Sequence, residues 1–382
     1  MLIDLFSEKA RAPAEAVIKV DGVEITDLYP FLLELTVETS RTEAATATLS
    51  FETRRDEHGV WTVQDAEVLV PWARIEILAT FGSRTEEIMR GYIREVSLET
   101  PTDAGAARVK VECQDDSIRL DREHRRKTWG SEDLPSSDSL LLAEVLGPYG
   151  LAPHPDNAQG QAHVVGLAQD DTDVKLLRAR ADFNGYELIF REGMVYFGPM
   201  RLSSDPQSTV LVYAGDDTNC LSLSVRADGH KADAVAYDAP SASGDGTTAE
   251  TVYPDLPLLG TTHADSTSAG LEAFVWRMSA EAGADAARLQ SLAQQKANDL
   301  DIHRLEAEGE LDGTLYGHVL LPGLPVGVDG LGDWMSGVYY VDGVTHEIDT
   351  NGYRQRVRLL RNAYGDNLSE LSGIASALEG VI

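Results

Sequence analysis

Two stretches far apart in the chain share one pattern, and this pattern decides the fold. The first reads Val70-Pro-Trp-Ala-Arg-Ile-Glu-Ile, and the second reads Leu321-Pro-Gly-Leu-Pro-Val-Gly-Val. In both, a proline follows the first apolar residue and alternating Ile or Val residues end the stretch, which is typical of a strand. The repetition predicts that the chain builds a similar β module twice, near its two ends.

Each copy then reaches a glycine that opens a longer run. One run is Gly91-Tyr-Ile-Arg-Glu-Val-Ser-Leu-Glu99, and the other is Gly337-Val-Tyr-Tyr-Val-Asp-Gly-Val-Thr-His-Glu347. Nine residues after the end of each run, across a polar turn, a further strand-like run starts at Arg108 and at Arg356. Two similar modules in one chain would let a trimer present six similar units around an axis. Such a trimer could match a threefold object to a sixfold one.

The rest of the first third is also rich in strand signals. Thr- and Val-rich runs with partial alternation recur at short intervals, and an Asp21-Gly22 hairpin signal follows the first of them. These runs cover residues 16–20, 32–38, 45–51 and 75–81. We expect an α+β chain that is predominantly β, with barrel-like or sandwich-like modules.

The character changes after Asp115. A helix is expected over residues 140–146, after a serine-rich start and before Gly147-Pro148, and a second over 174–183, with the Thr172 hydroxyl as its cap and Gly185 as its end. A β-hairpin over 186–197 should follow. Together these elements predict a small α+β insert.

The domain boundaries follow from these changes. We expect an N-terminal arm at 1–14, a first β domain from 15–115 and 204–238, and an inserted α+β domain at 116–203. A second β domain at 239–365 would include a Gly- and Ser-rich loop at 239–270 and an amphipathic helix at 271–301, and 366–382 would be a tail.

Charge limits the partners. The chain has 32 Lys+Arg against 63 Asp+Glu, a formal net charge of −31. A surface of this sign repels phosphate, so we expect no direct nucleic-acid recognition. No run approaches the roughly 20 apolar residues of a spanning helix, and the N-terminus lacks the basic start of a signal peptide, so we expect no membrane insertion.

The two cysteines, Cys113 and Cys220, are too few for a disulfide framework or a cysteine-based zinc site. Both lie in strand-like runs, where buried free thiols are the usual outcome. We therefore expect a protein made in a reducing cytoplasm.

The sequence contains no recognisable catalytic constellation. It has no nucleophile elbow, no His-Glu-x-x-His, no phosphate loop and no dinucleotide fingerprint. His263-Ala-Asp265 and Asp299-Leu-Asp-Ile-His303 offer metal-ligand atoms, although a solvated helix end explains the second group better. We expect no enzyme activity, no metal and no cofactor.

One basic cluster stands out in the acidic chain: Arg119, Arg122, Arg125, Arg126 and Lys127. These residues are either a solvated loop paired locally with neighbouring acids, or a contact onto an acidic face of a neighbouring copy. Both interpretations remain open at this point, and the five residues are our interface candidates.

The stretch from Asp173 to Gly198, with its helix, Gly185-Tyr186 pair, strand, glycine turn and aromatic strand, resembles the phage late control protein D family. The later stretch from Leu321 to His346 is similar to the second β module of that family, and the order of parts agrees over roughly 15–362. The resemblance implies a structural baseplate hub of a contractile tail or injection machine, related to the N-terminal half of type VI secretion spike proteins.

The same resemblance implies a homotrimer with two tandem tube-like β-barrel domains per chain, which adapts the sixfold tail tube to a threefold spike. Its partners would be a separate spike protein, the tail tube ring protein and other baseplate proteins, with the hub incorporated into the baseplate of a phage tail or injection particle. Three alternatives remain open. One is a tail-associated cell-wall hydrolase, and the second is a hexameric tube-initiator protein. The third is an adhesin or carbohydrate-binding sandwich, which would explain the β content but not the duplication.

Overall fold

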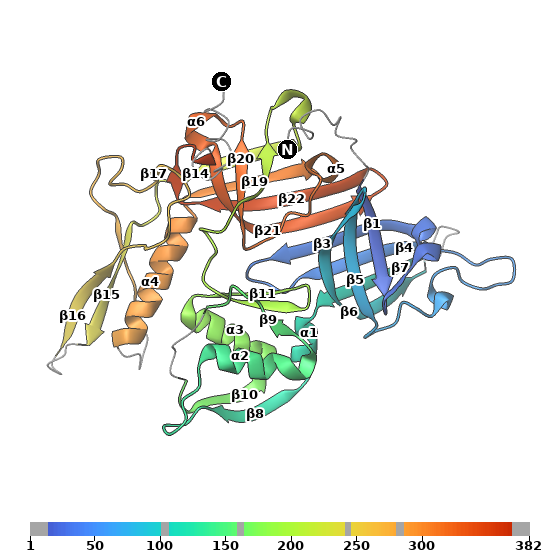
Figure 1. Ribbon diagram of the computed structural model, residues 1–382, viewed down its shortest axis with the longest axis horizontal. Helices are drawn as coiled ribbons and strands as arrows, with labels where there is room; N and C mark the ends of the chain where they lie inside the picture. The colour runs from blue at the N-terminus through green and yellow to red at the C-terminus, as the bar shows by residue number, and fades with distance from the viewer. Residues whose placement is uncertain (1–13, 101–106, 159–163, 241–245, 280–285, 369–382) are drawn as a thin grey trace.

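The computed structural model describes residues 14–100, 107–158, 164–240, 246–279 and 286–368. Figure 1 shows the N-terminal half, in blue, beside the C-terminal half, in orange and red, with the inserted unit, in green, below them. Most of the N-terminal arm expected at 1–14 and most of the tail expected at 366–382 lie outside the described residues.

The N-terminal half is built from antiparallel strands around one apolar core, in which Ile18, Leu35, Leu49 and Ile75 are fully buried. Alternating burial along β4 puts every second side chain into this core, as a half-buried strand requires. The elements are β1 (Ala14–Val20), β2 (Val23–Glu24), η1 (Thr26–Phe31), β3 (Leu32–Ser40), β4 (Thr46–Thr53), η2 (Gln64–Ala66), β5 (Arg74–Phe81), β6 (Arg84–Glu99) and β7 (Ala107–Asp115).

The inserted unit has its own core and contains the expected helices and hairpin. Ser137 caps the first long helix by accepting a hydrogen bond from Leu140 N, and Gly185 ends the second at φ 67°. Thr172 precedes that second helix without a side-chain capping bond, because its hydroxyl donates to Asp121 instead. The elements are α1 (Ser117–Leu120), β8 (His124–Trp129), α2 (Asp138–Leu146), η3 (Gly147–Tyr149), β9 (Ala152–Pro153), β10 (Leu167–Thr172), α3 (Asp173–Asn184), β11 (Glu187–Arg191) and β12 (Met194–Gly198).

The C-terminal half encloses a second apolar core, which includes Val210, Leu311, Val326 and Tyr339. Its strands begin earlier than the expected boundary at 239: β13 and β14 pair with β20 and β19, so residues 207–227 belong by hydrogen bonding to this half and not to the first. The elements are β13 (Gln207–Leu211), η4 (Gly215–Asp217), β14 (Cys220–Ala227), β19 (Leu305–Asp312), α5 (Gly313–Tyr316), β20 (Pro325–Asp329), α6 (Gly332–Met335), β21 (Gly337–Asp349), β22 (Gly352–Arg361) and β23 (Ala363–Tyr364).

Between β14 and β19 the chain forms a lateral arm of β15 (Ala234–Pro240), β16 (Thr247–Val252), β17 (Thr262–His263), β18 (Val275–Arg277) and α4 (Ala286–Ile302). Two predictions need correction here. The region expected as a loop contains β16 and β17, and the helix expected from 271 to 301 is replaced at its start by β18. Asp233 explains the strand, because its backbone N–H donates to Phe274 O at 2.7 Å and its carboxylate accepts from Phe274 N at 2.7 Å.

The two halves repeat one strand order. In chain order, the principal strands are β1, β3, β4, β5, β6 and β7 in the first half, and β13, β14, β19, β20, β21 and β22 in the second. Across the sheet they run β3-β4-β7-β6-β5-β1 and β14-β19-β22-β21-β20-β13, which is the same permutation. One pairing differs: β1 is antiparallel to β5, whereas β13 is parallel to β20.

Two of the bulges recur at equivalent places in the two halves. A bulge at Leu33 interrupts the β3·β4 pairing, and one at Leu221 interrupts β14·β19. A second bulge falls at Arg94 in β6 and at Asp342 in β21. A bulge changes the pairing of a strand at one defined residue, so matching bulges mark equivalent positions. They therefore fix which residues of the two halves correspond.

The quoted motif corresponds residue by residue as well. Trp72 and Gly323 both adopt positive φ, 72° and 74°. Trp72 N donates to Ile93 O at 2.7 Å, and Gly323 N donates to Val341 O at 2.9 Å. The equal spacing of Arg108 and Arg356 in the sequence does not make these two residues equivalent in the structure. The aligned bulges make Arg354 the counterpart of Arg108.

The prediction of a predominantly β chain is confirmed, but the strands do not form two separate sheets. Strand β3 of the first half pairs with β21 of the second, so one 13-stranded antiparallel sheet, with parallel β13 at its side, passes through both halves. This β3·β21 joint connects residues about 300 positions apart and is visible in Figure 1 as the place where the blue and red strands meet.

Candidate assembly interface

The β3·β21 joint is a continuous antiparallel ladder from Gly343 opposite Ser40 to Asp349 opposite Glu34. Its two faces differ in chemistry. Leu35 and Val37 are fully buried on one face, opposite Ile348 and His346. The other face carries Thr, Ser, Glu and Asp side chains. An alternation of this kind specifies one register, because a slip by one residue would move the apolar set to the solvent.

His346 is the polar member of the buried face. Its exposed fraction is 1%, its Nδ1 lies 2.8 Å from the Tyr353 hydroxyl, and the two rings stack. Burial, with the neighbouring Arg191 charge, lowers the pKa of His346 to about 3. The imidazole is therefore neutral in the folded protein at neutral pH, as an apolar strand joint requires.

Arg41 connects the joint to the inserted unit. Its Nε donates to Asp342 Oδ1 at 2.8 Å, at the bulge of β21, and its Nη1 lies 3.6 Å from Glu187 Oε1 on β11. Burial raises the pKa of Glu187 to about 6, although the Arg41 charge and the hydrogen bond from Tyr340 Oη, at 2.8 Å, oppose the shift. Because the three parts of the chain meet here, their relative placement is set by buried polar contacts.

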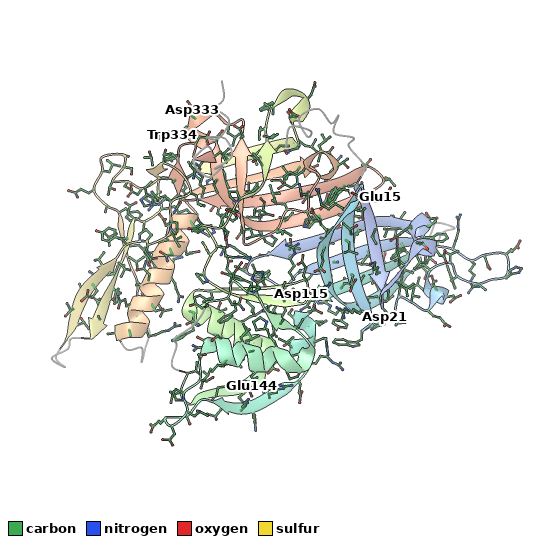
Figure 2. The ribbon with its side chains drawn as sticks, viewed as in Figure 1. Glu15, Asp21, Asp115, Glu144, Asp333 and Trp334 are labelled. Atoms are coloured by element: carbon green, nitrogen blue, oxygen red, sulfur yellow. The ribbon has the colours of Figure 1, made fainter. Side chains whose placement is uncertain are left out.

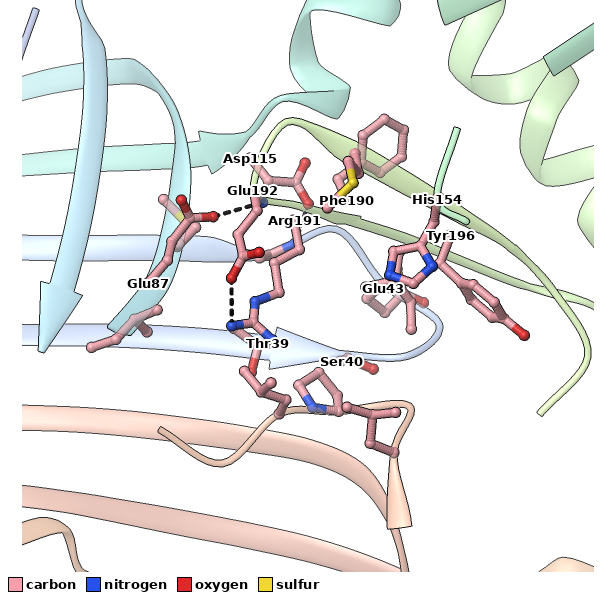
Figure 3. Close-up of a pocket in the computed structure, with 18 of the residues that line it drawn as sticks. Thr39, Ser40, Glu43, Glu87, Asp115, His154, Phe190, Arg191, Glu192 and Tyr196 are labelled. Atoms are coloured by element: carbon pink, nitrogen blue, oxygen red, sulfur yellow. Dashed lines mark hydrogen bonds and ion pairs between the residues drawn. The ribbon is translucent and has the colours of Figure 1, made fainter. Parts of the chain in front are cut away.

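A cavity of about 130 Å³ lies beside this contact, between the end of β3, strand β6 and the β11–β12 hairpin. In Figure 3 Glu87 accepts a hydrogen bond from Glu192 N, at 2.8 Å, and Arg191 pairs with the Glu192 carboxylate. Asp115 accepts from Ala45 N at 2.7 Å, and burial raises its pKa to about 6. These charged groups each bind a backbone group or a neighbouring side chain, so they tie the segments together.

The five residues of the basic cluster surround the start of the inserted unit, and each has an intrachain partner. Arg122 lies over the Trp72 ring, with its guanidinium carbon 4.3 Å from the centroid. Arg119 donates to Tyr149 O at 3.0 Å, and Arg125 pairs with the buried Asp173 at 3.0 Å. The remaining two lie on β8: Arg126 pairs with Asp170 at 2.7 Å, and Lys127 pairs with Glu144. Figure 2 labels Glu144 on α2.

Arg125 and Arg126 differ in how deeply their ion pairs are buried. The Asp173 side chain is 1% exposed, so Arg125 neutralises a buried charge. The side chain of Arg126 is 81% exposed and its partner Asp170 is 64% exposed. The Arg126 side chain is therefore available to a second molecule.

The candidate metal ligands are partly brought together. His263 lies between two carboxylates, with Nε2 2.7 Å from Asp301 Oδ1 and Nδ1 3.1 Å from Asp265 Oδ2. The hydrogen bond with Asp301 raises the pKa of His263. His303 instead contacts Asp299. Within the described parts of the chain, no group of three or more His, Cys, Asp or Glu side chains is arranged to hold a metal ion.

Two features of the structure were not predicted from the sequence. One is the Arg41–Asp342 pair, whose members are too distant in the chain for spacing to connect them. The other is a pair of unpaired strand edges: β14 bonds only to β19, and residues 95–99 of β6 bond only to β7. Leu98, an apolar side chain that is 49% exposed in the single chain, lies on the second edge. Both cysteines are free and buried, as expected.

Solved structures of known proteins share this fold. A 43 kDa tail protein of prophage MuSo2 from Shewanella oneidensis matches with a TM-score of 0.66 at 14% identity, over 91% of this chain and 98% of that one. A tail protein from Neisseria meningitidis MC58 matches with a TM-score of 0.64 at 14% identity, over 92% and 97%. A component of the type VI secretion system of E. coli matches with a TM-score of 0.53 at 11% identity, over 92% and 79%.

The recognition of a tail-protein and type VI fold from the sequence is thereby confirmed. No helix in the described ranges is long and apolar enough to cross a membrane. No curated protein matches the chain in sequence. A family model described as the Alg8 N-terminal domain matches residues 11–350, which is most of the chain. The chain belongs to the Alg8 N-terminal domain family.

Proposed function

We propose that this chain is a structural baseplate hub of a contractile tail or injection machine, and that three copies form a ring of six similar sheet halves. The observation that carries the proposal is the strand order that occurs twice, with matching bulges, inside one chain. A trimer of such chains has exact threefold symmetry and approximate sixfold symmetry. It can therefore bind a sixfold tube on one side and a threefold spike on the other.

The comparisons support a structural role, since the similar proteins are described as tail proteins and as a type VI secretion component. In this role each sheet half would act as one tube-like β domain of the ring. The partners would be a tail tube ring protein, a separate spike protein and other baseplate proteins. The particle would be assembled from protein made in the bacterial cytoplasm.

Native mass and negative-stain images of the purified protein test the proposal. We expect the mass of three copies of the 41.5 kDa chain, and annular particles whose rotational averages show six lobes of two alternating kinds. Six copies would favour the tube-initiator alternative, and a monomer at every concentration would contradict the hub. Fragment release from purified peptidoglycan would instead favour a cell-wall hydrolase, and we expect none.

The basic cluster offers a second test of the assembly. We propose that Arg126 contacts an acidic face of a neighbouring copy. Arg126→Glu should then weaken trimer formation several-fold at low salt, and the loss should fade as salt screens the contact. The thermal midpoint should hardly change, because exposed ion pairs contribute about 0–1 kcal/mol.

Lys175→Glu is the matched control for Arg126→Glu, since Lys175 is an exposed cation of the same unit paired with Asp171 at 3.0 Å. Analytical ultracentrifugation at several salt concentrations measures both variants. Equal association constants for wild type and Arg126→Glu would show that Arg126 makes only its intrachain ion pair.

A further inference from the structure

We propose that strand β14 of one copy pairs, antiparallel, with residues 95–99 of strand β6 in a second copy. This pairing rests on the proposed trimeric hub for its stoichiometry, but its geometry comes from the single chain. Both segments present an unpaired edge among the described residues, since β14 bonds only to β19 and residues 95–99 only to β7. Open sheet edges of this kind are templates for pairing with another chain.

The β3·β21 joint within the chain is the template. By strand order, β21 of the second half corresponds to β6 of the first, and β3 of the first half corresponds to β14 of the second. Within one chain, β21, the counterpart of β6, therefore pairs with β3, the counterpart of β14. The same joint formed between copies would place β6 beside β14 and continue the sheet from one molecule into the next.

The matching bulges fix the register of this second joint. Asp342 corresponds to Arg94, so His346 of β21 corresponds to Leu98 of β6. Leu221 corresponds to Leu33, so Val225 of β14 corresponds to Val37 of β3. Because His346 faces Val37 in the intrachain joint, Leu98 should face Val225 of the second copy.

In this register, side chains of similar polarity lie opposite one another. On one face Val96 and Leu98 would meet Ala227 and Val225, so apolar groups meet apolar groups. Leu98 is 49% exposed in the single chain and would lose this exposure.

The opposite face is polar and its charges are complementary. Ser97 would face Arg226, with Glu95 and Glu99 diagonal to the guanidinium on either side. The Arg226 side chain is 73% exposed in the single chain and pairs with Asp228 at 3.3 Å. A cation between two carboxylates favours this partner over a copy in a shifted register.

A second copy is the occupant that fits these edges. The two edges are different surfaces of one molecule, so each copy offers one of each and the contact is head-to-tail. Head-to-tail contacts close into rings or extend into filaments. Closure after three copies would alternate the intrachain and interchain joints around six sheet halves.

Cysteine cross-linking tests the register. In the full-length Leu98→Cys/Val225→Cys variant, mild oxidation should give covalent dimers and trimers on a non-reducing gel, and reductant should remove them. Directly opposite residues of antiparallel strands lie about 4.5–5.5 Å apart at Cα, within the range of a disulfide. Mixing the two single variants should give covalent dimers only.

The control variant is Ser97→Cys/Val225→Cys, whose thiols would point to opposite faces and should cross-link at least tenfold less. A charge exchange gives an independent reading. Arg226→Glu should weaken self-association several-fold, as should Glu99→Arg, and the variant with both changes should recover most of the loss. Sedimentation measures the three association constants.

The outcomes separate this pairing from the hub itself. A native trimer without cross-links, or cross-links equal in both double variants, would overturn the β14·β6 pairing and leave the hub standing. Cross-linked chains that extend without closing at three copies would support the pairing and contradict the hub. A persistent monomer without cross-links would overturn both.

Discussion

Replacing Arg304 by methionine is expected to lower the free energy of unfolding by about 3–5 kcal/mol, because it leaves two buried carboxylates without their cation. The Arg304 side chain is 1% exposed. Its Nη2 lies 3.0 Å from Asp233 Oδ1, and its Nε lies 2.8 Å from Asp301 Oδ1. It also donates to the carbonyl oxygens of Ala232 and Ala264.

The position of Arg304 explains why the effect should be large. Asp233 binds the start of β18, and Asp301 lies in the last turn of α4, so the guanidinium connects the lateral arm to the beginning of β19. Burial alone would raise the pKa of Asp301, but hydrogen bonds from His263, Arg304 and Asn362 lower it. The carboxylate is thus charged in the folded protein and depends on these donors.

Urea unfolding of Arg304→Met measures the loss. The matched control is Arg354→Met, which removes an ion pair with Glu310 whose arginine is 44% exposed, and there we expect about 0–1 kcal/mol. Adding Asp233→Asn and Asp301→Asn to Arg304→Met should recover part of the stability, because no unpaired buried charge remains. An unchanged unfolding midpoint for Arg304→Met would refute this account of the arm.

Acidification is expected to weaken the β3·β21 joint through His346. The folded-state pKa of His346 is about 3, against 6.5 for an ordinary histidine, so between these values the unfolded chain binds more protons than the folded one. The contribution of His346 is therefore complete above pH 6.5 and is lost as the pH falls towards 3. Between pH 7 and pH 5 the loss should be about 2 kcal/mol.

Two other buried groups act in the opposite direction. The pKa values of Asp115 and Glu187 are raised to about 6, so these carboxyls bind protons more readily in the folded state. Their contribution improves as the pH falls through 6, and it partly masks His346 in the wild type. The difference between wild type and a variant isolates the histidine.

His346→Gln retains a hydrogen-bonding group beside Tyr353 but does not titrate. The free energy of unfolding of each protein is measured in urea at pH 7 and at pH 5. On acidification it should fall by about 2 kcal/mol less in His346→Gln than in the wild type. His58→Gln is the control, because it makes the same substitution at a side chain that is 76% exposed. Parallel profiles for wild type and His346→Gln would show that this histidine is not held neutral.

Local chemistry made the individual elements predictable. Ser137 and Gly185 mark helix ends because a cap and a left-handed residue act over one turn, and both were expected from the sequence. The strands of both halves, the insert hairpin and the repeated motif around Pro71 and Pro322 are equally local. Alternation and glycine placement are enough to reveal them.

Elements whose form depends on distant partners were not predictable. The start of the expected helix at 271 became β18 because Asp233, some forty residues away, binds Phe274. The Thr172 hydroxyl donates to Asp121 and does not cap the helix that follows it. Strands β13 and β14 joined the second half because their partners β20 and β19 lie about 80–120 residues further on. Propensity carries no information about such partners.

By itself the sequence determined that one β pattern occurs twice, that an α+β unit separates the copies, and that the chain is strongly acidic. Only the tertiary structure decided that β3 and β21 join the copies into one sheet, and which edges are left unpaired. The physical reason is that side-chain alternation specifies the buried face of a strand but not its neighbour. Strand neighbours are chosen by the packing of the whole chain, in which Arg41, Arg304 and His346 hold together segments that lie far apart along it.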